Sequence, residues 1–119
     1  MKKIFLLLQI FFFIFHFDSL ADEKLINSLK EGKKIIFIRH AYAPGNGDPN
    51  NFRLDDCSTQ RNLNEKGIKQ SKKIGFFFKS NSIKIDKILS SEWCRCKDTA
   101  KIAFGNFKTY NALNSFYDE

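Results

Sequence analysis

The sequence predicts an α/β fold with a parallel sheet, and three observations support this prediction. Segments with strand character alternate along the chain with segments of helical periodicity. Residues 35–38 are all β-branched or aromatic, which is typical of a strand buried on both faces of a parallel sheet. The first two strand candidates are followed at once by polar pairs, Arg39-His40 and Ser90-Ser91. Because the carboxyl ends of parallel strands share one edge, we expect both pairs on one rim.

The first half of the predicted order is helix, strand and loop. Residues 22–31 show helical periodicity, and Gly32 is expected to end that helix. The strand at residues 35–38 comes next. Residues 43–53 hold both prolines of the chain and two glycines, so we expect a loop there.

The second predicted helix covers residues 65–79. Asn64 precedes it and can cap its first turn, in which Glu65 also favours the helix N-terminus. The apolar and small residues repeat at helical spacing, so we expect one buried face. The residues predicted to share that face are Ile68, Ser71, Gly75 and Phe78.

The rest of the predicted order is strand, helix and strand. Residues 83–89 form a strand candidate that leads directly into the serine pair. A further helix is expected over residues 93–104, where Gly105 provides a natural end. Residues 107–110 could form a third, short strand.

The N-terminus has the three-part layout of a secretory signal peptide. Residues 1–3 are a short positive start, residues 4–17 carry no formal charge, and Ser19-Leu20-Ala21 has small residues at its first and third positions. This apolar run is shorter than the roughly 20 residues of a membrane-spanning helix. We predict a signal peptide over residues 1–21, cleaved near Ala21, and a secreted or periplasmic domain over residues 22–119. An uncleaved, membrane-anchored terminus is the alternative.

Length and charge restrict the classes of partner. A chain of 119 residues holds one domain at most. The net charge of +7 comes mainly from scattered lysines, with no block of five basic residues. We therefore expect a solvated basic surface that favours an anionic substrate, and no nucleic-acid partner. Contact with a membrane is expected only through an uncleaved signal.

Secretion would place the three cysteines, Cys57, Cys94 and Cys96, in an oxidising compartment. An odd number predicts one bridge and one free thiol. Cys94 and Cys96 are too close to pair easily, so Cys57 is expected to pair with either of them. A metal site is not expected, because the chain has only two histidines and no Cys-x-x-Cys.

His40 is the one histidine outside the predicted signal, and it is a candidate nucleophile. An imidazole is largely neutral near pH 7, because its ordinary pKa is about 6.5. Arg39 and Arg95 would supply planar donor forks that match phosphate. The three side chains together favour phosphoryl transfer. The alternative is a structural histidine beside two surface ion pairs.

Three blocks of the sequence resemble motifs of the histidine phosphatase superfamily, the phosphoglycerate-mutase-like fold. They occur in the order and at the spacing of the family, and they extend over about residues 33–105. Three further segments resemble a secreted bacterial branch of it. The blocks are residues 35–41, 62–71 and 90–100, and the further segments are residues 56–63, 93–96 and 113–116.

The resemblance implies a three-layer sandwich with a mostly parallel sheet, and phosphomonoester hydrolysis. His40 would become phosphohistidine, and Arg39 and Arg95 would hold the phosphoryl oxygens. No metal or organic cofactor is implied, and the substrate would be a phosphorylated small molecule or a phosphoprotein. The implied substrate-binding residues are Asn46, Ser90 and Ser91.

The chain also departs from the family pattern. Leu113-Asn114-Ser115 stands where mutase-type members carry a glutamate proton donor, and there is no second histidine outside the signal. The family's fourth motif would lie beyond residue 119, so we expect a truncated domain without its C-terminal strands, which acts as a phosphomonoesterase if the missing C-terminal part is supplied. The alternatives are a non-catalytic secreted anion-binding relative and a membrane-anchored fragment. A cysteine-dependent phosphatase is excluded, because Cys57 and Cys94 lack an arginine six residues later.

Overall fold

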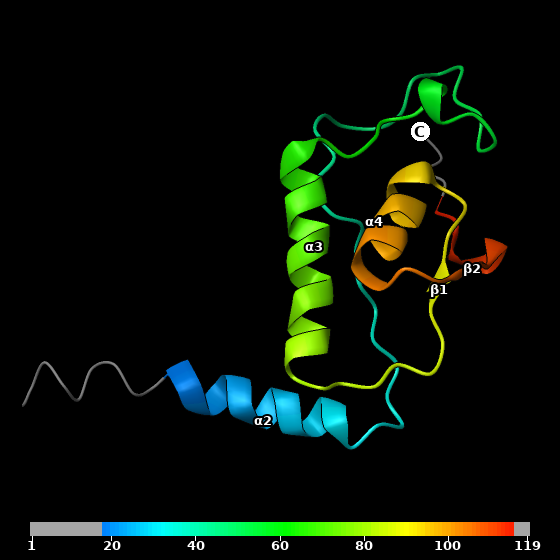
Figure 1. Cartoon of the computed structure of the whole chain (residues 1–119). Helices are drawn as coiled ribbons and strands as arrows, with labels where there is room; N and C mark the ends of the chain where they lie inside the picture. The colour runs from blue at the N-terminus through cyan, green and yellow to red at the C-terminus, as the bar shows by residue number, and fades with distance from the viewer. Residues whose placement is uncertain (1–17, 116–119) are drawn as a thin grey trace, which may run out of the picture. The chain divides into compact units, whose positions relative to one another are not determined.

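The computed structural model describes residues 18–115 as parts of two units, divided between Ile35 and Ile36. The first unit contains helix α2, Asp18–Lys30 (Figure 1). The helix predicted over residues 22–31 is confirmed, although it begins earlier. Gly32 follows it with a φ of 70°, a left-handed conformation that favours glycine. The predicted signal peptide falls mostly on residues outside the described part and stays a prediction.

The second unit combines helices with a two-stranded parallel sheet. Leu89 lies opposite Lys108, and Ser90 lies opposite Thr109. Helix α4 packs against both α3 and β1, so it lies between α3 and the strands (Figure 1). The alternation of helices and parallel strands is confirmed, and the wider three-layer sandwich stays a prediction. The elements are η2 Cys57–Thr59, α3 Glu65–Ser80, β1 Leu89–Ser90, α4 Cys94–Phe104, β2 Lys108–Thr109 and η3 Asn111–Leu113.

Helix α3 begins as its sequence predicts. The side-chain oxygen of Asn64 accepts a hydrogen bond from the backbone N–H of Gly67 at 3.1 Å. The buried face contains Ser71 and Phe78, as expected, but Ile68 is 37% exposed. Gly67 is buried in its place, because the backbone of Tyr42 lies where a Cβ on Gly67 would be. In this part of α3, the backbone of Tyr42 packs directly against Gly67, where an apolar side chain was expected.

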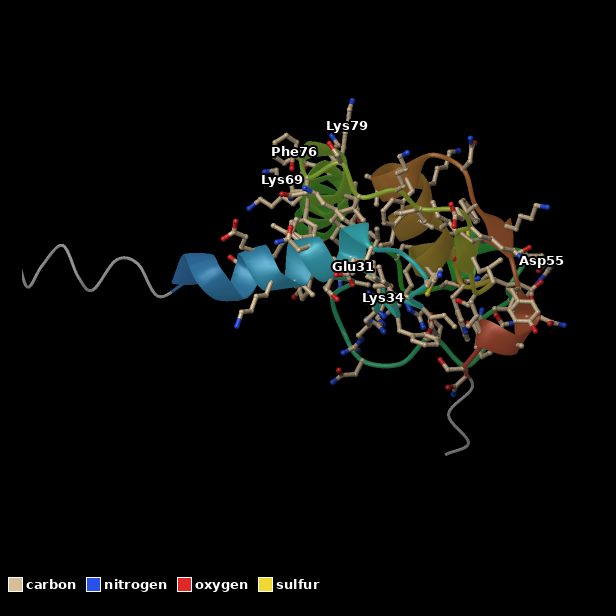
Figure 2. All side chains as sticks on the ribbon, turned by 90° about the horizontal axis from the view of Figure 1, so that it is seen from below. Glu31, Lys34, Asp55, Lys69, Phe76 and Lys79 are labelled. Atoms are coloured by element: carbon tan, nitrogen blue, oxygen red, sulfur yellow. A yellow bond between two sulfur atoms is a disulfide. The ribbon has the colours of Figure 1, made fainter. Side chains whose placement is uncertain are left out.

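A second glycine allows α3 and α4 to pack closely. A Cβ on Gly75 would overlap the carbonyl of Ala103 in α4. Nearby, the rings of Phe78 and Phe104 meet edge to face with centroids 5.3 Å apart. The opposite face of α3 is exposed, and Lys69, Phe76 and Lys79 point away from α4 there (Figure 2).

The strand predicted over residues 35–38 is wrong. This segment is not a strand, and Ile35 and Phe37 are 84% and 83% exposed. A strand needs a hydrogen-bonding neighbour, and within residues 18–115 the sheet consists of β1 and β2 alone. The strand predicted over residues 83–89 is also wrong for most of its length, because β1 begins only at Leu89.

The later elements agree better with the sequence. Helix α4 begins one residue after the expected start, and Gly105 ends it with a φ of 81°. The short strand predicted over residues 107–110 is confirmed as β2. No helix between residues 18 and 115 has the length and apolar character needed to cross a bilayer.

Candidate functional site

The imidazole of His40 is half-buried and hydrogen-bonded to the backbone of the next residue. Its Nδ1 lies 2.7 Å from the carbonyl oxygen of Ala41. A carbonyl oxygen only accepts hydrogen bonds, so Nδ1 carries the proton and donates it. In the neutral ring, Nε2 therefore keeps its lone pair. This is the tautomer that a nucleophilic histidine needs.

Side chains from both helices hold the backbone that follows His40. The backbone N–H of Ala41 donates to Thr99 Oγ1 at 2.9 Å, and that hydroxyl donates to the carbonyl of Arg95 at 2.7 Å. The N–H of Tyr42 donates to Gln70 Oε1 at 2.8 Å. Gln70 and Thr99 lie in the sequence blocks 62–71 and 90–100, which resemble family motifs, so the sequence contained one indication of their importance. Their role as backbone clamps was not predicted.

The pKa of His40 is lowered from its ordinary value of 6.5. Burial is the largest cause, because it penalises the charged ring, and the bond to Ala41 opposes it. The positive charges of Arg95, Arg61 and Arg39 lower the pKa further. The neutral, nucleophilic form is therefore favoured at lower pH than for a free histidine.

Arg95 is a buried cation in the first turn of α4. Its Nη1 donates to both carboxylate oxygens of Asp48, at 2.9 Å each. Its guanidinium carbon lies 4.5 Å from the centre of the Trp93 ring. Its Nε is buried and has no hydrogen-bond partner among the described residues. The guanidinium of Arg95 is thus held at Nη1 by Asp48 and on one face by Trp93, while its Nε–H is left without an acceptor among the described residues.

Arg61 is a further residue of the site that the sequence did not predict. Its Nε donates to the carbonyl of Gly47 at 2.8 Å, and its Nη1 donates to the carbonyl of Ala43. Its backbone N–H donates to Asp48 Oδ1 at 2.8 Å. Arg61 lies within residues 56–63, a segment already noted for its resemblance to one branch of a family. That was the available signal.

A disulfide joins the segment before Arg61 to the start of α4. Cys57 and Cys94 are bonded, and Cys96 is a free thiol. Buried Gln60 reinforces this link, because its Oε1 accepts from the backbone N–H of Cys94 at 2.9 Å. Its Nε2 donates to the carbonyl of Arg53 at 2.6 Å. Two independent bonds therefore hold this segment against α4.

The other predicted site residues differ in burial. Arg39 and Asn46 are exposed, and Arg39 is close enough for its charge to act on His40. Ser90 and Ser91 are buried at the end of β1. Ser90 Oγ donates to the carbonyl of Ser91 at 2.9 Å, whereas Ser91 Oγ has no partner among the described residues.

Asn114 lies in the segment Leu113-Asn114-Ser115, and its side chain pairs with Glu92. Its Oδ1 accepts from the backbone N–H of Glu92 at 2.8 Å. Its Nδ2 donates to Glu92 Oε2 at 2.7 Å. The amide thus orders the segment between β1 and α4, and it has no acidic proton to give.

The family model of the histidine phosphatase superfamily, branch 1, matches residues 35–113, more than half of the chain. The chain belongs to the histidine phosphatase superfamily. The match contains His40, both arginines of the predicted site and Arg61. No curated protein and no solved structure matches the sequence significantly. The resemblance to a secreted bacterial branch stays a prediction.

Proposed function

We propose that this histidine phosphatase hydrolyses phosphomonoesters through a phosphohistidine on His40. The observation that carries the proposal is the bond from Nδ1 to Ala41, which leaves Nε2 as the nucleophilic nitrogen beside three guanidinium groups. Nε2 attacks phosphorus and the ester P–O bond breaks. The leaving oxygen departs with the bonding electrons and takes up a proton. Water then attacks phosphorus, the P–N bond breaks, and phosphate leaves.

The arginines supply the electrostatic part of the proposal. Charge on the phosphoryl oxygens is stabilised by fixed cations more strongly than by water, because the cations need no reorganisation. Arg95 is already oriented by Asp48 and Trp93. Arg39 is exposed next to His40, and we assign it a contact with the phosphoryl group of the substrate. No metal or organic cofactor is part of this mechanism.

Compartment, fold and substrate class belong to the same proposal. We propose a secreted or periplasmic protein with a signal peptide over residues 1–21. The Cys57–Cys94 disulfide supports this, because such bonds persist in oxidising compartments. The three-layer sandwich is proposed from the family and from the parallel pair β1–β2. The proposed substrate is a phosphorylated small molecule or a phosphoprotein.

Hydrolysis of p-nitrophenyl phosphate by the full chain tests the proposal. We expect phosphate release by the wild-type protein and none by His40→Asn. Arg95→Met should retain less than about a tenth of the wild-type rate, because a charge-assisted contact to the phosphoryl group is lost. Arg53→Met is the matched control, since Arg53 is exposed and pairs with exposed Asp55 at 2.9 Å. Equal rates for wild type and His40→Asn would contradict the proposal.

A non-catalytic anion-binding protein is the second candidate function. The segment Leu113-Asn114-Ser115 favours it, because neither Asn114 nor Ser115 can act as a good general acid. A binder needs the arginines and not His40. This alternative predicts that the wild-type chain and His40→Asn bind phosphate equally well and that neither releases phosphate from an ester.

A further inference from the structure

We propose that Asp48 is a positioning residue that holds Arg95 and Arg61 in place around the phosphate site. The inference rests on the proposed function, in which Arg95 binds the phosphoryl group. Asp48 is not among the residues that the sequence motifs single out. It acts through the arginines and not through the reacting atoms.

Asp48 connects two segments that are distant in sequence. Its carboxylate accepts from Nη1 of Arg95 with both oxygens and from the backbone N–H of Arg61 with Oδ1. The side chains of Asp48 and Arg95 are only 8% and 9% exposed. A buried ion pair with this many hydrogen bonds resists separation. If the two side chains moved apart, each would remain as a buried charge without a partner.

Arg61 also holds Asp48 in place, through a second hydrogen bond to the neighbouring residue. Arg61 donates from Nε to the carbonyl of Gly47, the residue before Asp48. Gly47 has a φ of 64°, which turns the chain so that this carbonyl and the Asp48 side chain both reach Arg61. Two hydrogen bonds from Arg61, one to each neighbour in the turn, therefore anchor Asp48.

The pairing also determines which part of Arg95 can receive an anion. Nη1 is committed to Asp48, and in a planar guanidinium the Nε–Nη2 edge lies on the other side of the carbon. Nε on that edge is buried without a partner among the described residues. A buried donor without a hydrogen bond is unfavourable, so Arg95 retains a donor for an incoming oxyanion.

The first test measures inorganic phosphate binding to the full chain by its effect on the His40 ring signals in NMR. We expect Asp48→Asn to weaken phosphate binding by roughly tenfold or more, because the amide no longer holds the guanidinium with a full charge. Asp55→Asn is the matched control, because Asp55 is exposed (Figure 2) and forms an ion pair with Arg53 instead of a contact with the site. It should bind phosphate as the wild type does. Unchanged or tighter binding by Asp48→Asn would overturn the proposal.

A second variant and a second readout keep the test independent of folding. Asp48→Glu keeps the charge of the buried pair but moves the carboxylate, and we expect it to weaken phosphate binding as well. The Arg95 Nε–H signal should move and broaden in both variants and stay in place in Asp55→Asn. Wild-type-like Arg95 signals in both Asp48 variants would contradict a positioning role.

A double-variant comparison separates action through Arg95 from a merely structural effect. In an Arg95→Met background, adding Asp48→Asn should cause no further loss of phosphate binding, because the Oδ1 of asparagine can still accept from the backbone N–H of Arg61. A further tenfold loss would mean that Asp48 acts in another way. If the wild type binds phosphate but forms no phosphohistidine, the proposed catalysis fails and the role of Asp48 stands. A wild-type chain that binds no phosphate overturns both.

Discussion

At the scale of single residues, the tautomer of His40 is the feature on which the chemistry depends. The carbonyl of Ala41 fixes the proton on Nδ1, and Thr99 fixes Ala41 through the N–H of the same residue. Burial and neighbouring cations then lower the pKa of the ring. Orientation and protonation state are thus set by different contacts, and each can be tested separately.

We expect the pKa of His40, measured by NMR titration, to lie below 6.5. Because the folded-state pKa is lowered, His40 contributes stability that is complete above about pH 6.5 and is lost as the pH falls through the folded pKa. Arg39→Gln should raise the pKa by removing one repelling charge. Lys79→Gln is the control, because Lys79 is not among the charges acting on His40. A pKa that is unmoved in Arg39→Gln would contradict this electrostatic account.

Asn114 leads to a second prediction at this scale. A positioned acid typically contributes 10²–10⁴-fold, roughly, when the leaving oxygen needs a proton. Because neither Asn114 nor Ser115 is an acid, we expect aryl phosphates with acidic phenols to be hydrolysed much faster than alkyl phosphates. Rates measured over a series of phenyl phosphates should rise steeply as the pKa of the phenol falls. A flat dependence would show that an acid operates elsewhere in the site.

At the scale of elements, two glycines allow α3 to approach its neighbours. We expect Gly75→Ala to lower the free energy of unfolding by about 1–3 kcal/mol, because the new Cβ would overlap the Ala103 carbonyl. Urea unfolding measures this difference. The matched control is Lys72→Ala on the exposed face of α3, which should stay within about 0.5 kcal/mol of wild type. Equal stability of both variants would argue against close packing of α3 on α4.

The helices were predictable because their signals are local. Asn64 caps α3 by a contact three residues away, and Gly105 ends α4 through its own φ. The strand at residues 35–38 was not predictable in this way, because an apolar run shows only that a neighbour would be favourable. Whether such a run is buried depends on distant strands. Its 84% exposure at Ile35 follows from the absence of such a neighbour within residues 18–115.

The part of the site that lies in short sequence motifs was predictable. Arg39, His40 and Arg95 were chosen from residue type and position at the ends of expected elements. Asp48 and Arg61 were not, because their contacts join residues 47 and 13 positions apart and leave no periodic pattern. Long-range ion pairs are visible only once the chain is folded.

At the scale of the whole domain, the Cys57–Cys94 disulfide joins the Arg61 segment to α4. The bond spans 37 residues, for which the chain-entropy model gives about 4 kcal/mol of stabilisation. We expect Cys57→Ser to lower the urea midpoint and also to weaken phosphate binding, because the segment before Arg61 then loses its covalent link to α4. Cys96→Ser is the control, since Cys96 is a free thiol. Equal midpoints for the two variants would contradict a structural role of the bond.

The central claim is a covalent phosphohistidine on His40, and trapping it tests that claim most directly. The full chain is mixed with p-nitrophenyl phosphate, quenched in alkali, in which phosphohistidine survives, and mapped by mass spectrometry. We predict one added phosphoryl group on the peptide that contains His40, and none in His40→Asn. Turnover without that adduct, or an adduct on another residue, would contradict the account.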